Sequence, residues 1–166
     1  MRLYRLPVLL TFLLLAACAG DSPLAPGGEE LAPSLTIAGQ SGCYVVRGTI
    51  SETGLFPAFG GVVSGDLEGT SATTVGFAGI TGKVIRNPGV RTIEVTGGTV
   101  PELVGVTLEQ SLEGISINTG AGPVRINERT TLESGAARGT FTTHGWLDTS
   151  VVPWEIDLAY RGVICL

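Results

Sequence analysis

The sequence predicts an all-β domain in which antiparallel strands form a single barrel or a sandwich. Apolar and polar residues alternate in several runs, which is typical of strands with one buried face. Glycine, which occurs 25 times in the chain, punctuates these runs at positions that suit turns. The stretch 100–107 is too short for a substantial helix and contains Gly105.

The predicted strands follow one another between residues 61 and 164. The clearest alternation lies in residues 61–69, 91–96, 124–133 and 154–164. Because successive side chains of a strand point to opposite faces, one parity of each run should face the interior. We expect these core residues: Val63, Leu67, Ile93, Val95, Leu108, Leu112, Ile126, Phe141, Leu147, Ile156, Leu158 and Tyr160.

The run 104–118 predicts a strand with a change of parity. Its early apolar residues occupy even positions, whereas Ile115 and Ile117 occupy odd ones. A β-bulge at Gly114 would return both sets to one face and bend the strand. Long bent strands are typical of closed barrels.

The N-terminus carries the features of an export signal. Arg2 and Arg5 provide the positive start, and residues 6–17 are apolar except for Thr11. This run is too short for a permanent membrane span, which needs about 20 apolar residues. We therefore interpret residues 1–17 as a signal peptide.

The end of that run, Leu15-Ala16-Ala17-Cys18, resembles the lipobox of bacterial lipoproteins. The resemblance implies cleavage before Cys18 and acylation of its thiol with chains such as palmitate. Several chains together anchor a protein stably in a membrane. The protein is then expected in the bacterial cell envelope, and Ala19 in place of Asp favours the outer membrane. The alternative is an ordinary secretory signal followed by an incidental cysteine.

Composition divides the rest of the chain into a tether and a domain. Residues 19–33 are rich in Pro, Gly, Ala and acids and lack apolar periodicity. We expect 18–36 to be a lipidated flexible tether and 37–166 to be the β domain. Removal of the signal peptide leaves eight basic and fifteen acidic side chains, a net charge of −7. This charge argues against nucleic acid and anionic lipid as partners.

If Cys18 carries lipid, Cys43 and Cys165 remain as a pair in an oxidising compartment, and we expect a disulfide between them. Two free thiols are the alternative. If the first and last strands are neighbours, the same register places Arg47 opposite Arg161. Directly opposed like charges are unfavourable, so relief is expected from Asp157 or from a bound anion, unless the two solvated side chains splay apart.

A second resemblance concerns the domain itself. Val95-Thr96-Gly97-Gly98-Thr99 with Leu103-Val104-Gly105 resembles a hairpin of allene oxide cyclase-like and dirigent-like barrels. The glycine-spaced run 64–70 is similar to an earlier strand of those proteins. The resemblance implies an eight-stranded barrel with an apolar interior. The catalytic residues of the plant enzymes have no matching positions in this chain.

Candidate chemistry is sparse. His144 is the single histidine, with Asp148 four residues later on the same side of the predicted strand, and the alternative is a surface histidine beside threonines. The chain shows no spacing typical of a metal site, a P-loop or a nucleophile elbow. We therefore expect no metal and no cofactor, and assign no catalytic residue. A polar site, if present, would involve Arg47, Arg161, Asp157 and His144.

These observations predict an envelope-anchored lipoprotein with a non-enzymatic β-barrel that binds a small apolar ligand or acts as an interaction module. One alternative is a cyclase-like enzyme that acts on a lipid-derived substrate in the barrel cavity. The other is a structural β-sandwich that displays a surface to other envelope proteins. An open or a filled interior would separate these hypotheses.

Overall fold

The computed structural model of the chain describes residues 42–118, 120 and 122–166. The predicted signal peptide 1–17, the tether 18–36 with Cys18, and the first residues of the predicted domain, 37–41, lie outside the described residues. Within the described part, no helix is both long and apolar enough to cross a membrane.

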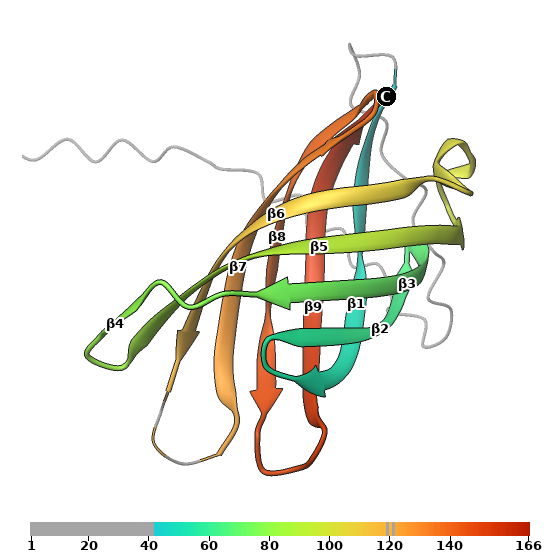
Figure 1. Cartoon of the computed structure of the whole chain (residues 1–166). Coiled ribbons are helices and arrows are strands. Elements are labelled where there is room, and N and C mark those ends of the chain that lie inside the picture. The colour runs from blue at the N-terminus through green and yellow to red at the C-terminus, as the bar shows by residue number, and fades with distance from the viewer. Residues whose placement is uncertain (1–41, 119, 121) are drawn as a thin grey trace, which may run out of the picture. The chain divides into compact units, whose positions relative to one another are not determined.

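The described part consists of nine strands and one short 3-10 helix, η1 (Figure 1). In chain order they are β1 (Cys43–Leu55), β2 (Ala58–Gly65), β3 (Leu67–Val75), β4 (Gly79–Thr81), β5 (Val84–Gly98), η1 (Pro101–Leu103), β6 (Thr107–Ile117), β7 (Val124–Ser134), β8 (Ala137–Asp148) and β9 (Trp154–Cys165). The predicted runs of alternating residues all lie within or across these strands.

Eight of the strands form a closed antiparallel barrel. Successive strands pair from β1 to β3 and from β5 to β9, β9 pairs with β1, and β3 pairs with β5. The all-β barrel prediction is therefore confirmed. The alternative β-sandwich is wrong, because a single hydrogen-bonded sheet closes on itself and leaves no second sheet to pack against it.

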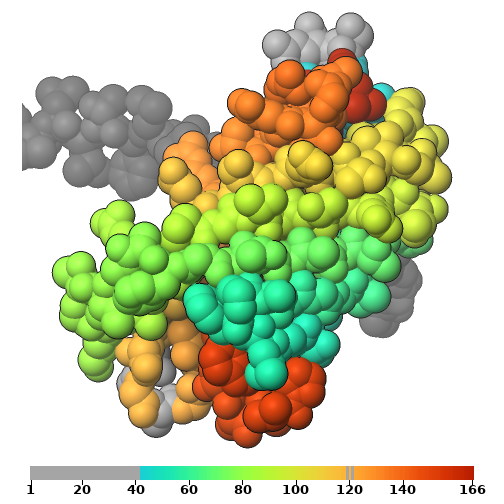
Figure 2. Space-filling model, viewed as in Figure 1, coloured from blue at the N-terminus to red at the C-terminus, as the bar shows by residue number. Residues whose placement is uncertain are grey.

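The ninth strand, β4, continues the line of β3 along β5. β3 pairs with β5 from Gly89 to Gly98, and β4 pairs with the first residues of the same strand. As a result, the β4–β5 hairpin extends beyond the end of β3 (Figure 1). In the face drawn in Figure 2, side chains of β2, β3, β5 and β6 form a continuous wall.

The predicted bulge at Gly114 is wrong. β6 pairs with β5 and β7 without a register shift, and its even residues from Leu108 to Ser116 all face inward. Ile115 instead faces outward. The parity of the apolar residues changes because the interior at this level is not apolar, so that Gly114 and Ser116 take the inward positions. A register shift does occur elsewhere, between Glu68 and Gly69, where β3 meets β5.

The interior at one end of the barrel is filled. Val100 and Leu103, from the connection between β5 and β6, are buried against the core and plug this end. The predicted core residues are buried here and along the barrel, except Leu147, which is only partly buried. Tyr160 lies over Gly48 on the paired strand, where a Cβ would lie 2.6 Å from the ring. Its hydroxyl oxygen accepts a hydrogen bond from the Leu67 N–H.

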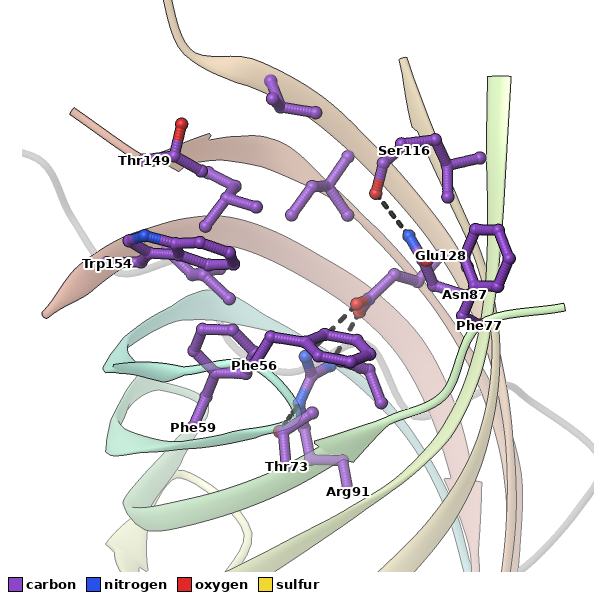
Figure 3. Close-up of a pocket in the computed structure, with 17 residues that line it drawn as sticks. Phe56, Phe59, Thr73, Phe77, Asn87, Arg91, Ser116, Glu128, Thr149 and Trp154 are labelled. Atoms are coloured by element: carbon purple, nitrogen blue, oxygen red, sulfur yellow. Dashed lines mark hydrogen bonds and ion pairs between the residues drawn. The ribbon is translucent and has the colours of Figure 1, made fainter. Parts of the chain in front are cut away.

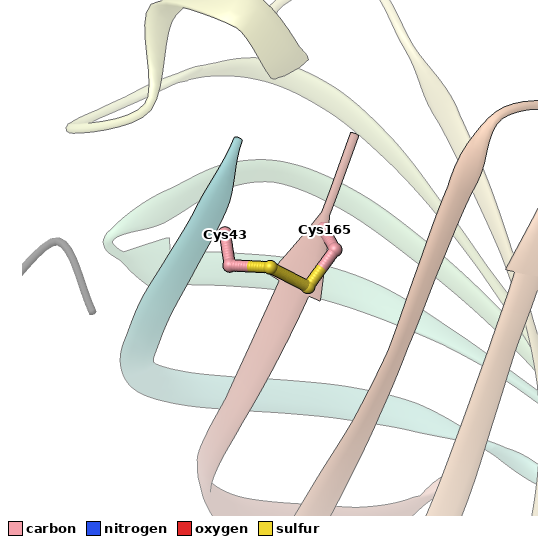
Figure 4. The surroundings of a disulfide bond; sticks show 2 residues. All are labelled: Cys43 and Cys165. Atoms are coloured by element: carbon pink, nitrogen blue, oxygen red, sulfur yellow. A yellow bond between two sulfur atoms is a disulfide. The ribbon is translucent and has the colours of Figure 1, made fainter. Parts of the chain in front are cut away.

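A disulfide closes the seam between the first and last strands at the same end (Figure 4). Cys43 and Cys165 are directly paired, and their Cα atoms lie 4.0 Å apart. The predicted disulfide is confirmed. The same register pairs Arg47 with Arg161, as expected from the cysteine positions.

Candidate functional site

The end of the barrel opposite the disulfide contains a cavity of about 280 Å³ (Figure 3). Its mouth lies among the β1–β2 turn, the β3–β4 connection and the loop before β9. Phe56 and Phe77 line it while remaining 50% and 61% exposed, so the cavity reaches the surface. Its walls are mainly aromatic and aliphatic: Phe56, Phe59, Val75, Phe77, Ile85, Val124, Ile126, Leu147, Trp154 and Ile156.

The aromatic side of the wall is assembled from separate strands. Phe59 on β2 and Trp154 on β9 stack with their ring centroids 6.5 Å apart. Phe56, at the end of the β1–β2 hairpin, lies beside Phe59 in the view of Figure 3. The closure of the barrel is what brings β2 and β9 to the two sides of β1, and with them the two stacked rings.

The inner part of the cavity is polar. Arg91, Glu128, Thr73, Asn87 and Ser116 line it together with the apolar walls. Asn87 donates from its side-chain amide to the Ser116 hydroxyl. Arg91 and Glu128 point toward each other from different strands, and Figure 3 draws the bonds between them.

Arg91 is the centre of this polar group and is 1% exposed. Its Nε donates to the Thr73 hydroxyl over 2.8 Å, and its Nη1 donates to Glu128 Oε2 over 2.9 Å. Its Nε also lies 3.5 Å from Glu52 Oε1. Burial alone would lower the pKa of the guanidinium, but the charges and hydrogen bonds of Glu128 and Glu52 outweigh burial and raise this pKa. Arg91 is therefore held as a cation inside the barrel.

Two carboxylates share this one cation. Glu52 is 1% exposed and accepts a hydrogen bond of 2.7 Å from the Thr73 hydroxyl. The Glu128 side chain is 7% exposed and accepts a bond of 2.7 Å from the Thr143 hydroxyl. Counted as two carboxylates and one guanidinium, the group has a formal charge of −1. Glu52 Oε2 has no hydrogen-bond partner among the described residues.

No protein-family model, curated protein or solved structure matches this chain.

The residues that the sequence suggested for a polar site lie on the outer wall rather than in the cavity. Arg47, Arg161 and His144 are exposed. Asp157 accepts a hydrogen bond of 2.7 Å from the Ser51 hydroxyl, and within the described residues the ion pairs involve only Arg91. The expected relief of the two arginines by Asp157 is therefore not seen as an ion pair.

The suggested partner of His144 is also engaged elsewhere. The Asp148 carboxylate accepts hydrogen bonds from the hydroxyl and the backbone N–H of Ser150, and these bonds lower its pKa. Among residues 42–118, 120 and 122–166, no group of three or more His, Cys, Asp or Glu side chains could hold a metal ion.

The buried charged residues were not identified from the sequence, although their positions in the alternating pattern could have indicated them. Arg91 has the same parity as Ile93 and Val95, and Glu128 has the same parity as Ile126. Glu52 likewise follows Ile50 by two positions. A charged side chain at an inward-facing position of a strand must find a partner in the interior, because burying it alone is costly. Three such residues on three different strands indicate a buried polar site.

Proposed function

We propose that this barrel binds a small, mostly apolar ligand in the cavity at its open end, in a lipoprotein that Cys18 anchors to the bacterial envelope. The observation that carries the proposal is the contrast between the two ends of the barrel. Val100 and Leu103 fill one end, whereas the other contains a cavity lined by aromatic and aliphatic residues.

The lining of the cavity supports a binding role. Small-molecule sites are concave and mainly apolar, and they carry a few polar groups that orient the ligand. The volume of about 280 Å³ lies near the lower end of the roughly 300–1,000 Å³ of such sites. The aromatic residues of the lining would contact the apolar body of a ligand, and Arg91 and Glu128 would contact its polar end.

The test is a titration with N-phenyl-1-naphthylamine, an uncharged probe whose fluorescence rises in an apolar environment. Val124→Trp narrows the cavity from its wall and should weaken binding. Val62→Trp makes the same change on the exposed outer face, where Val62 is 54% exposed, and should bind like wild type. The binding role is refuted if the wild-type protein fails to enhance the fluorescence, or if both variants behave alike.

The anchor has a separate test. Cells that express the wild-type chain and receive labelled palmitate should incorporate label, whereas Cys18→Ser should not and should accumulate unprocessed precursor. An unmodified mature N-terminus beyond Cys18, measured by mass spectrometry, would contradict the lipoprotein assignment.

A second candidate function is an enzyme of the cyclase-like type that acts on a lipid-derived substrate. The specific observation in its favour is a carboxylate and a guanidinium inside an apolar cavity, where electrostatic effects on a bound molecule are strong. The test is the consumption of compounds from a lipid extract, followed by mass spectrometry. Catalysis would require that Glu128→Gln abolish this consumption while binding of the uncharged probe persists.

A further inference from the structure

The charged group inside the cavity determines which kind of polar end a ligand can carry. Two of the three side-chain nitrogens of Arg91 donate short hydrogen bonds, and the third makes one long contact. Nε contacts Thr73, Nη1 contacts Glu128 Oε2, and Nη2 lies 3.5 Å from Glu128 Oε1. An anionic ligand would approach a cation that already lies beside Glu52 and Glu128, whose carboxylates would repel the anion.

The Glu128 carboxylate, in contrast, has an oxygen available. Oε2 accepts from both Arg91 and Thr143, whereas the one contact of Oε1 among the described residues is the 3.5 Å approach of Arg91 Nη2. Such a long contact is at the limit of hydrogen bonding. Glu128 also lines the cavity, so a donor on a ligand can reach it.

The formal charge of the buried group and the aromatic lining of the cavity both favour a cationic ligand. By formal count, Glu52, Arg91 and Glu128 have one negative charge in excess, which a monocation would compensate. Phe56, Phe59, Phe77 and Trp154 line the same cavity, and aromatic faces attract cations. A bound cation would then have a carboxylate partner and aromatic walls in place of its lost water.

We propose that the ligand is an organic monocation, an amine with a short apolar body, whose ammonium group pairs with Glu128 while the body occupies the aromatic mouth. This inference rests on the proposed ligand-binding function and names the class of ligand.

The experiment compares three probes that share a seven-carbon chain: n-heptylamine, 1-heptanol and n-heptanoate, titrated calorimetrically at neutral pH into the folded barrel. At this pH the amine is a cation and the acid is an anion. We expect heptylammonium to bind about 10- to 100-fold more tightly than heptanoate, because a hydrogen bond to a charged group contributes on this scale. Heptanol should bind between them.

Glu128→Gln tests the partner, because it removes the charge and keeps the shape of the side chain. This variant should lose about 10- to 100-fold in affinity for heptylammonium, with a smaller change for heptanol. Glu113→Gln removes the same charge from the exposed face of β6 and should change neither affinity. If Glu128→Gln does not fold, the relative affinities of the wild-type protein for the three probes still test the inference.

The outcomes separate the two proposals. Binding of heptanoate as tightly as heptylammonium, or an unchanged amine affinity in a folded Glu128→Gln variant, overturns the inference and leaves the binding function intact. If none of the three probes binds, and N-phenyl-1-naphthylamine does not bind either, both proposals are overturned.

Discussion

The Arg91 guanidinium donates to the Glu128 carboxylate over 2.9 Å although their strands, β5 and β7, are not neighbours in the sheet. β6 lies between them, so the bond crosses the curved interior and links two strands that no backbone hydrogen bond joins. Thr143 on β8 and Thr73 on β3 extend the same network. A single buried cation thereby connects strands on several sides of the barrel.

Removing this cation should destabilise the fold strongly. Arg91→Met leaves Glu52 and Glu128 without a counter-charge in the interior, and breaking a buried ion pair in this way costs about 3 to 5 kcal/mol. The measurement is the free energy of unfolding from urea titration. Arg86→Met on the exposed part of β5 is the matched control and should have little effect. Replacing all three groups, with Glu52→Leu, Arg91→Met and Glu128→Leu, should recover much of the loss. Equal stability of Arg91→Met and Arg86→Met would contradict the role of the cation.

The disulfide should contribute stability through the unfolded state. Cys43 and Cys165 are separated by 122 positions in the sequence, and for a loop of this length the chain-entropy model gives about 4 to 5 kcal/mol. The double variant Cys43→Ala, Cys165→Ala should lose stability of this order in urea titration. A reducing agent should destabilise wild type and leave the double variant unchanged. Insensitivity of the wild-type unfolding midpoint to reduction would argue against a stabilising bond.

Stability should fall at alkaline pH partly because of Tyr160. Burial raises the pKa of its hydroxyl from 10.0 to about 12, the hydrogen bond with Leu67 opposes this shift, and the charge of Asp66 adds to it. The unfolded tyrosine ionises first, so this contribution is complete below pH 10 and is lost as the pH rises toward 12. Tyr160→Phe should show a shallower decline in the free energy of unfolding over this range. Parallel pH profiles for wild type and variant would refute the assignment.

The plugged end should depend on Leu103. This side chain is fully buried, and Leu103→Ala should cost about 2 to 5 kcal/mol because it leaves a cavity in the core. Its neighbour Val104 is 48% exposed, so Val104→Ala should change the free energy of unfolding by less than about 0.5 kcal/mol. Thermal or urea unfolding of the two variants makes the comparison. Similar losses in both would show that Leu103 does not fill the interior.

The candidate site could be predicted only in part, because its decisive residues look ordinary in the sequence. Arg91 and Glu128 stand among alternating apolar residues, and each could be placed on the inward face by parity alone. Their pairing could not be predicted, since it joins strands two places apart in a sheet whose order and curvature the sequence does not state. His144 and Asp157 were predicted to belong to a polar site, but they face outward in the folded barrel.

The prediction of a bulge at Gly114 was wrong for a related reason, because it also relied on residue type alone. The predicted bulge would place Ile115 on the same face as Leu112, yet Ile115 is 38% exposed and the neighbouring Ser116 lines the cavity. An apolar side chain predicts burial only where the interior it would enter is itself apolar. In this barrel the interior changes from apolar near Leu103 to polar near Arg91, and back to apolar at the aromatic mouth.

The strands could be predicted from the two-residue alternation that a half-buried strand requires, and the facing pair Cys43 and Cys165 from the number and positions of the cysteines. From that pair the register followed to Arg47 and Arg161, because opposed residues of an antiparallel pair keep a constant sum of positions. The pairing of β3 with β5, the filled and hollow ends of the barrel, and the contact of Arg91 with Glu128 could not be predicted in this way. These relationships depend on how the closed sheet curves through space. Alternation fixes which face of a strand is buried, but not what lies across the interior from it.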